Sequence, residues 1–152
     1  MRAITHAMTG AAIGLGVSEP AVAVPMALAS HYVLDALPHY GGGLPESEEL
    51  NSPTFRVLLL ADICLCPLLV LLLAVQRPQH WILAAICAFV AAAPDLASIN
   101  IYRRARRGEP PKTNRYTRFA HAIQWFERPL GGIFEAAWFM VMLVILVPII
   151  RK

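Results

Sequence analysis

Residues 54–75 read TFRVLLLADICLCPLLVLLLAV. This stretch carries only two charged side chains, Arg56 and Asp62, and it is long enough to cross a bilayer, which takes about 20 apolar residues in a helix. Because a bilayer offers no water to bond free backbone groups, a spanning segment of this kind has to be helical. The stretch therefore predicts a membrane helix and indicates an integral membrane protein.

The composition of the whole chain agrees with that interpretation. Hydrophobic residues make up 57% of the 152 residues and charged residues only 15%, whereas a soluble domain is roughly 45–50% apolar and about 25% charged. The length suits a single domain, residues 1–152. The net charge is +3, and several of the basic residues gather in residues 103–112. No nucleic-acid-binding motif accompanies them, so we expect no nucleic-acid partner.

Four further apolar segments flank the central one. Residues 130–150 and 81–99 are of spanning length, while 4–17 and 21–37 are short for a span and suit a tilted hairpin. Residues 115–128 place apolar groups on one helical face, which is typical of a helix lying at the membrane interface. The sequence thus predicts an all-α, polytopic membrane helical bundle of about four to five membrane helices plus one amphipathic interfacial helix.

The basic residues also orient the bundle. Short cytoplasmic loops are enriched in Lys and Arg, so the basic loop at 103–114 puts the end of segment 81–99 in the cytoplasm. Counting back, the polar loop at 41–52 and the start of the chain share that side. The pair Arg151-Lys152 then falls on the opposite side if residues 115–128 do not cross.

Ionisable side chains inside or beside these apolar segments are the second informative feature. Each costs on the order of 2.5–3.5 kcal/mol to place in hydrocarbon, so it requires a partner. The antiparallel order of the segments brings seven of these eight side chains, all but His121, near the predicted cytoplasmic face, and their types are those that bind divalent metals. They are His6, His31, Asp35, His39, Asp62, Asp95, His121 and Glu135.

Residue spacing divides this group by role. His31, Asp35 and His39 follow one another at four-residue intervals, so a continuous helix would carry them on one stripe. We expect the metal ligands to be His6, His31, Asp35, His39, Asp95 and His121. Asp62 and Glu135 lie outside the His-x-x-x-Asp string and are the expected catalytic bases. The alternative for each residue alone, above all His6 and Glu135, is a hydrogen bond between helices.

Several short strings resemble a known family. Thr5-His6-x-x-x-Gly10, Ser30-His31-Tyr32-x-Leu34-Asp35-x-x-Pro38-His39, Ala93-Pro94-Asp95-Leu96 and Phe119-Ala120-His121-x-x-Gln124 resemble, in this order, motifs of small bacterial membrane-bound metal-dependent hydrolases. The resemblance implies that His6, His31, Asp35, His39 and Asp95 bind metal. The His-x-x-x-Asp part is also similar to helical ligand pairs of zinc-dependent phospholipases C. The chain lacks the Asp-x-Asp-His stretch of some members.

These observations lead to a functional hypothesis. We expect a hydrolase of a bacterial or archaeal cytoplasmic membrane that acts on a lipid or lipid-linked ester or phosphoester at the cytoplasmic leaflet. Its divalent metal would be zinc by the histidine-rich ligands, with manganese or magnesium left open. Membrane lipids would be partners, and Gly10-x-x-x-Gly14 permits close helix approach and hence a homo-oligomer. The alternatives are a metal or proton transporter and a non-catalytic protein with a structural metal site.

Overall fold

The computed structural model describes residues 1–43, 46–110, 112 and 114–151, with the side chains of 46 and 47 left aside. This described part is helical and holds no strand beyond one isolated bridge between His39 and Glu127. The helices are α1 (Ala3–Gly16), α2 (Pro20–Asp35), α3 (Glu46–Glu49), α4 (Pro53–Gln76), α5 (Trp81–Leu96), α6 (Ile99–Arg106), α7 (Arg115–Ile123) and α8 (Gly131–Ile150). The predicted all-α class is confirmed.

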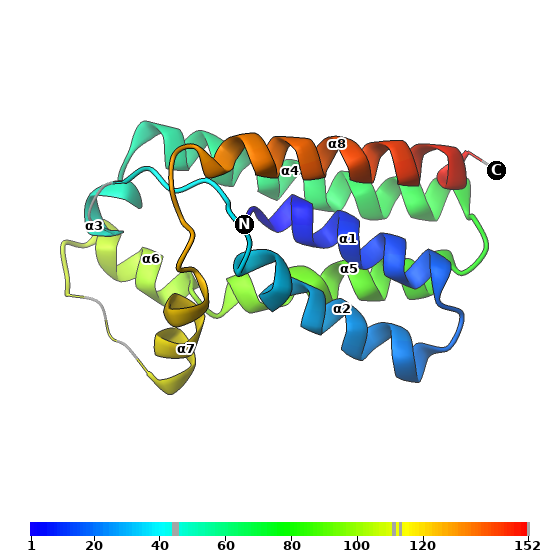
Figure 1. The fold of residues 1–152 in the computed structure, drawn as a ribbon, viewed down its shortest axis with the longest axis horizontal. Coiled ribbons are helices and arrows are strands. Elements are labelled where there is room, and N and C mark those ends of the chain that lie inside the picture. Colours follow the sequence, from blue (N-terminus) through cyan, green and yellow to red (C-terminus); the bar gives the residue numbers. More distant parts are fainter. Residues whose placement is uncertain (44–45, 111, 113, 152) are drawn as a thin grey trace.

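The long helices lie side by side along the long axis of the molecule (Figure 1). α1, α4 and α8 run in one direction, and α2 and α5 run in the other. The start of α1, α4 and α8 and the end of α2 and α5 therefore share one end of the bundle, where α3, α6 and α7 also lie. We call this end the α6–α7 end. The antiparallel order is the one expected from the sequence, and α8 finishes at the opposite end.

α1 occupies the middle of the bundle and contacts α2, α4, α5 and α8. Every residue from Ile4 to Ala11 is buried. The closest packing is with α5, because a Cβ atom on Gly10 would collide with the carbonyl oxygen of Cys87, and one on Gly14 would lie 2.6 Å from the Cα of Ala84. The small residues of α1 thus allow close packing against α5 of the same chain.

Two helices are long and apolar enough to cross a membrane, α4 with 24 residues and α8 with 20. A third span is counted if α5 and α6, which meet at a 40° bend, are taken together. Two or three is fewer than the predicted four to five. The difference lies in α1 and α2, whose 14 and 16 residues extend only about 21–24 Å at 1.5 Å per residue, against a hydrocarbon core of about 30 Å.

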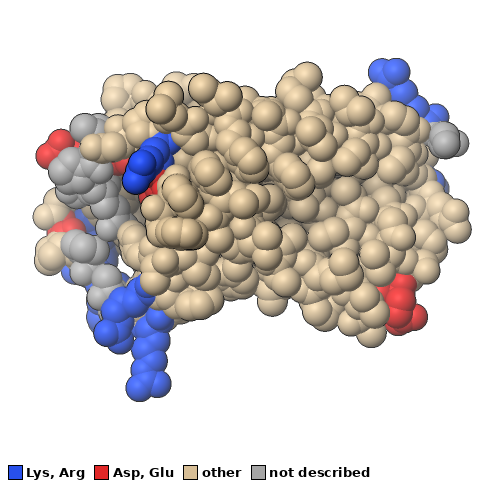
Figure 2. Space-filling model, viewed as in Figure 1, with Lys and Arg blue, Asp and Glu red and all other residues tan. Residues whose placement is uncertain are grey.

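The surface is consistent with a membrane protein. Figure 2 shows charged side chains at the two ends of the visible face and a wide uncharged band between them. Many large apolar side chains are exposed along α4 and α8, among them Leu60, Leu71, Val75, Ile133 and Val144. Lipid would cover such side chains.

The basic stretch is helical where a loop was predicted. α5 ends at Leu96, three residues before the predicted boundary, and α6 begins at Ile99 after a turn. α6 carries Arg103, Arg104 and Arg106 in its last turn, where cations interact favourably with the carbonyl end of the helix. The short helix α3 likewise lies within the loop predicted at 41–52.

Two other predicted boundaries were wrong. The amphipathic helix was expected over residues 115–128, but α7 ends at Ile123. α2 ends at Asp35, because Pro38 disfavours helical geometry at the residue before it. His39 therefore lies beyond the helix and does not continue the stripe of His31 and Asp35.

Candidate metal centre

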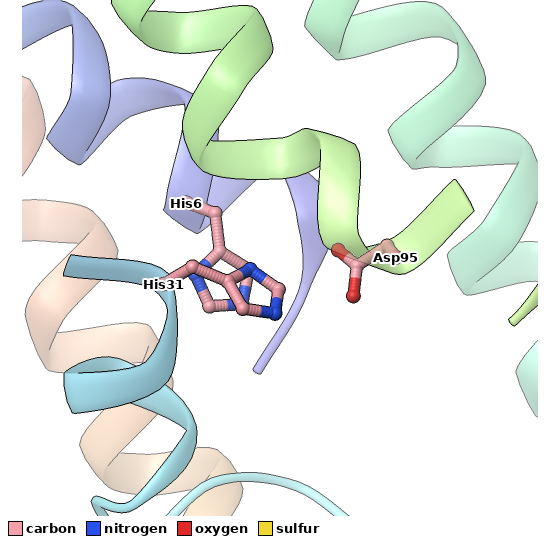
Figure 3. Close-up of side chains that lie close together, drawn as sticks. All are labelled: His6, His31 and Asp95. Carbon is pink, nitrogen blue, oxygen red and sulfur yellow. The ribbon is translucent and has the colours of Figure 1, made fainter. Parts of the chain in front are cut away.

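Three side chains from three helices converge at the α6–α7 end of the bundle. His6 lies in the first turns of α1, His31 near the end of α2 and Asp95 near the end of α5. Each offers one ligand atom, and the three atoms lie within 4.8 Å of one another. Figure 3 shows the two imidazole rings close together and the Asp95 carboxylate turned toward them; the two ring planes are tilted by 34°. This geometry brings potential ligands that are 89 residues apart in sequence within reach of one ion.

Hydrogen bonds fix the orientation of both imidazoles. His31 Nδ1 lies 2.9 Å from the carbonyl oxygen of Ala91, which can only accept, so Nδ1 carries the proton and Nε2 keeps its lone pair. His6 Nε2 lies 3.1 Å from Asp35 Oδ1, which by the same argument leaves the lone pair on Nδ1. Metal-binding histidines usually donate their second ring N–H to a carbonyl or carboxylate in this way.

Two buried atoms at this place have no hydrogen-bond partner among the described residues. They are His6 Nδ1 and Asp95 Oδ2. The His6 side chain is fully buried, and its ring centroid lies 4.1 Å from that of His31. Buried polar atoms are nearly always satisfied in native proteins, so these two atoms are exceptions and are available to bind a further group. A cation fits, since both atoms can act as electron-pair donors.

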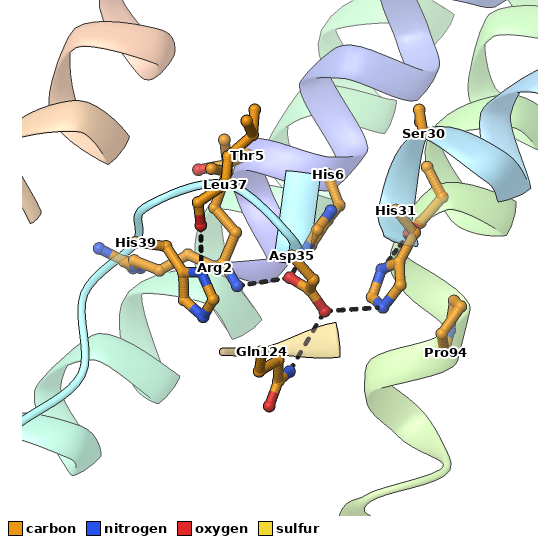
Figure 4. A network of polar contacts seen from close by, with 12 residues as sticks. Arg2, Thr5, His6, Ser30, His31, Asp35, Leu37, His39, Pro94 and Gln124 are labelled. Carbon is orange, nitrogen blue, oxygen red and sulfur yellow. Dashed lines mark hydrogen bonds and ion pairs between the residues drawn. The ribbon is translucent and has the colours of Figure 1, made fainter. Parts of the chain in front are cut away.

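Asp35 lies at the centre of the surrounding polar network (Figure 4). Its Oδ1 contacts His6, and its Oδ2 lies 3.3 Å from His31 Nε2 and 3.2 Å from Gln124 Nε2, which donates to it. The backbone nitrogen of Met1 lies 2.6 Å from Oδ1. Asp35 thus accepts a hydrogen bond from His6, and its Oδ2 faces the His31 nitrogen that keeps the lone pair; the three-residue ligand group does not include Asp35. Its predicted role as a ligand stays a prediction.

His39 and His121 lie outside the three-residue group as well. His39 is buried in the segment after α2, and its Nδ1 donates to the carbonyl oxygen of Leu37 over 2.8 Å. Burial lowers the pKa of His39, so its ring stays neutral and could still bind a metal. His121 is exposed on α7. Neither predicted ligand role is tested by these contacts.

The two predicted catalytic carboxylates both contact Arg2. Asp62 Oδ1 accepts from Arg2 Nη2 over 3.0 Å and from the backbone N–H of Ile4 over 3.3 Å. The buried Glu135 accepts from the backbone N–H groups of Arg2 and Tyr40. These contacts tie the start of α1 to α4 and α8. The role of either carboxylate as a general base stays a prediction.

Sequence reasoning assigned no role to three residues that the structure places here. Gln124 contacts Asp35 from the end of α7, Arg2 bridges to Asp62, and the Tyr116 hydroxyl donates to the carbonyl oxygen of Pro94 over 3.3 Å. Gln124 could have been found from its place three residues after His121. No sequence signal links Arg2 to Asp62, because Arg56 lies closer to Asp62 along the chain.

No family model, curated protein sequence or solved structure matches this chain. The interpretation of the site therefore rests on its own geometry.

Proposed function

We propose that the protein is a membrane-embedded, metal-dependent hydrolase whose divalent metal is held by His6, His31 and Asp95. The observation that carries the proposal is the pair of unpartnered buried atoms, His6 Nδ1 and Asp95 Oδ2, on two of the three residues whose potential ligand atoms lie within 4.8 Å of one another. The resemblance of the chain's short strings to membrane-bound metal-dependent hydrolases supports the same conclusion.

The donor set fits a catalytic centre better than a structural one. Structural zinc sites have four protein ligands, whereas catalytic sites have three and keep an open position. When bound, a divalent metal would supply Lewis acidity, which polarises an ester or phosphoryl oxygen and activates water. Two imidazoles and one carboxylate suit zinc and also manganese. Magnesium is less suited to imidazole.

The surrounding residues would orient this centre. Asp35 and the Ala91 carbonyl hold the two imidazoles in the tautomers that point a lone pair at the metal. Asp62 and Glu135 are the carboxylates proposed as general base. Both contact Arg2, which donates to Asp62 from its side chain and to Glu135 from its backbone N–H.

The proposed substrate is a lipid or lipid-linked ester or phosphoester. The site lies at one end of a bundle with apolar sides, so it would sit near the level of lipid head groups. We propose that α1 and α2 also lie within the bilayer, giving four to five membrane helices, and that α7 lies at the interface. The positive-inside bias of α6 and its loop supports a cytoplasmic location for this end.

Metal content is the direct test. We would measure metals by elemental analysis in detergent-purified wild type, in His31→Ala and in His80→Asn. His80 is exposed and distant in the fold, and Asn tolerates its positive φ of 64°. We expect stoichiometric metal in the wild type and in His80→Asn, and loss from His31→Ala. Wild-type protein without metal after metal-replete expression would refute the proposal.

Activity separates the enzyme from its two alternatives. Metal-loaded wild type and His31→Ala would be compared on a panel of lipid esters and phosphoesters. Hydrolysis by the wild type alone supports the enzyme. Tightly bound metal with no hydrolysis supports a structural site, and metal or proton flux into proteoliposomes supports a transporter.

A further inference from the structure

A second polar site lies at the α6–α7 end, apart from the metal centre. It is a recess of about 450 Å³ between α6 and the start of α7. Four basic side chains line it, Arg103, Arg104, Arg107 and Lys112, together with one carboxylate, Glu109. We propose that this recess binds the phosphate group of an anionic phospholipid.

The charge balance of the recess favours an anion. Glu109 Oε2 lies 3.0 Å from Arg104 Nη1, and its Oε1 lies 4.0 Å from Arg107 Nη1. Arg104 Nε also donates to the carbonyl oxygen of Pro110 over 2.8 Å. Glu109 therefore fixes Arg104 in place and cancels only one of the four positive charges. Arginine guanidinium groups bind phosphate oxygens through paired N–H donors.

The neighbouring helix adds to the positive potential. Asn114 and Thr117 line the recess and form the capping box of α7, in which each backbone N–H bonds to the side chain of the other residue over 2.8 Å. The N-terminal end of a helix carries a partial positive charge. The recess thus receives positive potential from α7 as well as from the basic side chains.

The place of the recess in the fold favours a lipid over a soluble phosphate compound. α6 continues α5 after a 40° bend, and the two together pass the length and hydropathy test for one span. Figure 2 shows the Lys and Arg side chains at this end bordering the uncharged band. Basic clusters next to a membrane span bind anionic lipid head groups. The proposal does not depend on metal binding or hydrolysis.

The test is lipid binding by native mass spectrometry of the detergent-solubilised full chain. Phosphatidylglycerol, phosphatidylcholine and glycerol phosphate would be titrated separately into the wild type. The double variant Arg103→Gln/Arg107→Gln removes two recess charges. The matched control Arg115→Gln/Arg118→Gln removes two charges from exposed residues of α7 outside the recess lining.

We expect the wild type to bind phosphatidylglycerol more tightly than phosphatidylcholine, the recess variant to bind it at least roughly tenfold more weakly, and the α7 control to match the wild type. Equal losses in both variants would show a nonspecific charge effect and overturn the proposal. Equally tight binding of glycerol phosphate would overturn the assignment to a lipid.

A folding control and a metal control complete the design. Unfolding temperatures of both double variants show whether a loss of binding reflects a damaged fold. If the recess variant unfolds at a lower temperature than the wild type, the single variant Arg103→Gln replaces it. Its expected loss of phosphatidylglycerol binding is smaller. In a His31→Ala background the recess variant should still bind phosphatidylglycerol more weakly than the α7 control, so failure of the metal proposal would leave this one standing.

Discussion

Asp35 shows how a single carboxylate can organise a site without belonging to its ligand group. It contacts His6, His31 and Gln124, which come from three different helices or their ends. Its spacing from His31 indicated a ligand pair, because side chains four residues apart share a helix face. In the structure that same spacing places Asp35 Oδ2 3.3 Å from His31 Nε2, while its Oδ1 contacts His6.

The first prediction separates a positioning role from a ligand role for Asp35. We expect Asp35→Asn to weaken metal affinity about 10–100-fold, as is usual when the partner of a metal-binding histidine is removed. Asp95→Asn should weaken it further, because it changes a ligand. Chelator competition would measure both, and a greater loss in Asp35→Asn would make Asp35 the ligand. Metal binding should also fall in both at acidic pH, since imidazole binds metal only when neutral.

The second prediction concerns the ion pair between Arg2 and Asp62. We expect Arg2→Met to destabilise the protein by about 1–3 kcal/mol, because the Asp62 carboxylate loses its charged partner inside a membrane helix. The double variant Arg2→Met/Asp62→Leu should recover most of that loss, since no unpaired charge remains. Equilibrium unfolding in mixed detergent would measure both. A double variant no more stable than the single one would contradict the structural role.

At the scale of elements, the contact between α1 and α5 depends on two small residues. Gly10 and Gly14 let the α5 backbone approach so closely that no side chain fits between the helices. Close backbone approach increases van der Waals contact. This contact drives helix association in a bilayer, because moving an apolar side chain from lipid into a helix interface brings no hydrophobic gain. This contact also sets the distance between His6 and Asp95.

The third prediction follows from that packing. We expect Gly10→Ala to destabilise the protein by about 1–3 kcal/mol through overpacking and to lower metal affinity. Gly16→Ala is the matched control on the same helix, since nothing lies within 4 Å of a Cβ at that position. Thermal unfolding in detergent would compare them. Equal stability of the two variants would show that the helices can separate at little cost.

The sequence predicted the longest apolar helices and the order in which they pack. α4 and α8 were found from continuous apolar runs, and the antiparallel order followed from loop placement. α6 was missed because its arginines were interpreted as the charges of a cytoplasmic loop. They lie in the last turn of α6, where they interact favourably with the carbonyl end of the helix. His39 was misplaced because helical spacing was extended past the point where Pro38 ends the helix.

The sequence predicted which residues form the candidate site, but not which of their polar atoms have hydrogen-bond partners. Chemical type and depth selected His6, His31 and Asp95 among eight residues. The division into atoms with and without partners depends on side-chain contacts from other helices, such as the Ala91 carbonyl on His31. Such contacts leave no periodic signal in the sequence.

On the scale of the whole molecule, the two ends of the bundle differ in chemistry. The α6–α7 end carries the proposed metal group, its polar network and the basic recess. The opposite end carries the turns between α1 and α2 and between α4 and α5 and the end of α8. A protein with this polarity would present all of its chemistry on one side of a membrane.

The fourth prediction is that these ends lie on opposite membrane sides. In a background with Cys64, Cys66 and Cys87 replaced by alanine, Arg118→Cys and Arg151→Cys introduce single thiols at exposed positions of the two ends. An impermeant maleimide added to sealed vesicles of one orientation should label only one of them. Lysed vesicles provide the control, and labelling of both thiols in sealed vesicles would contradict the arrangement.

The central position of α1 has a consequence for biosynthesis. α1 is translated before α5 and α8, two of the helices that enclose it. Asp95 also reaches the ribosome exit long after His6 and His31. Binding of the proposed metal by all three residues would therefore wait until α5 has been inserted.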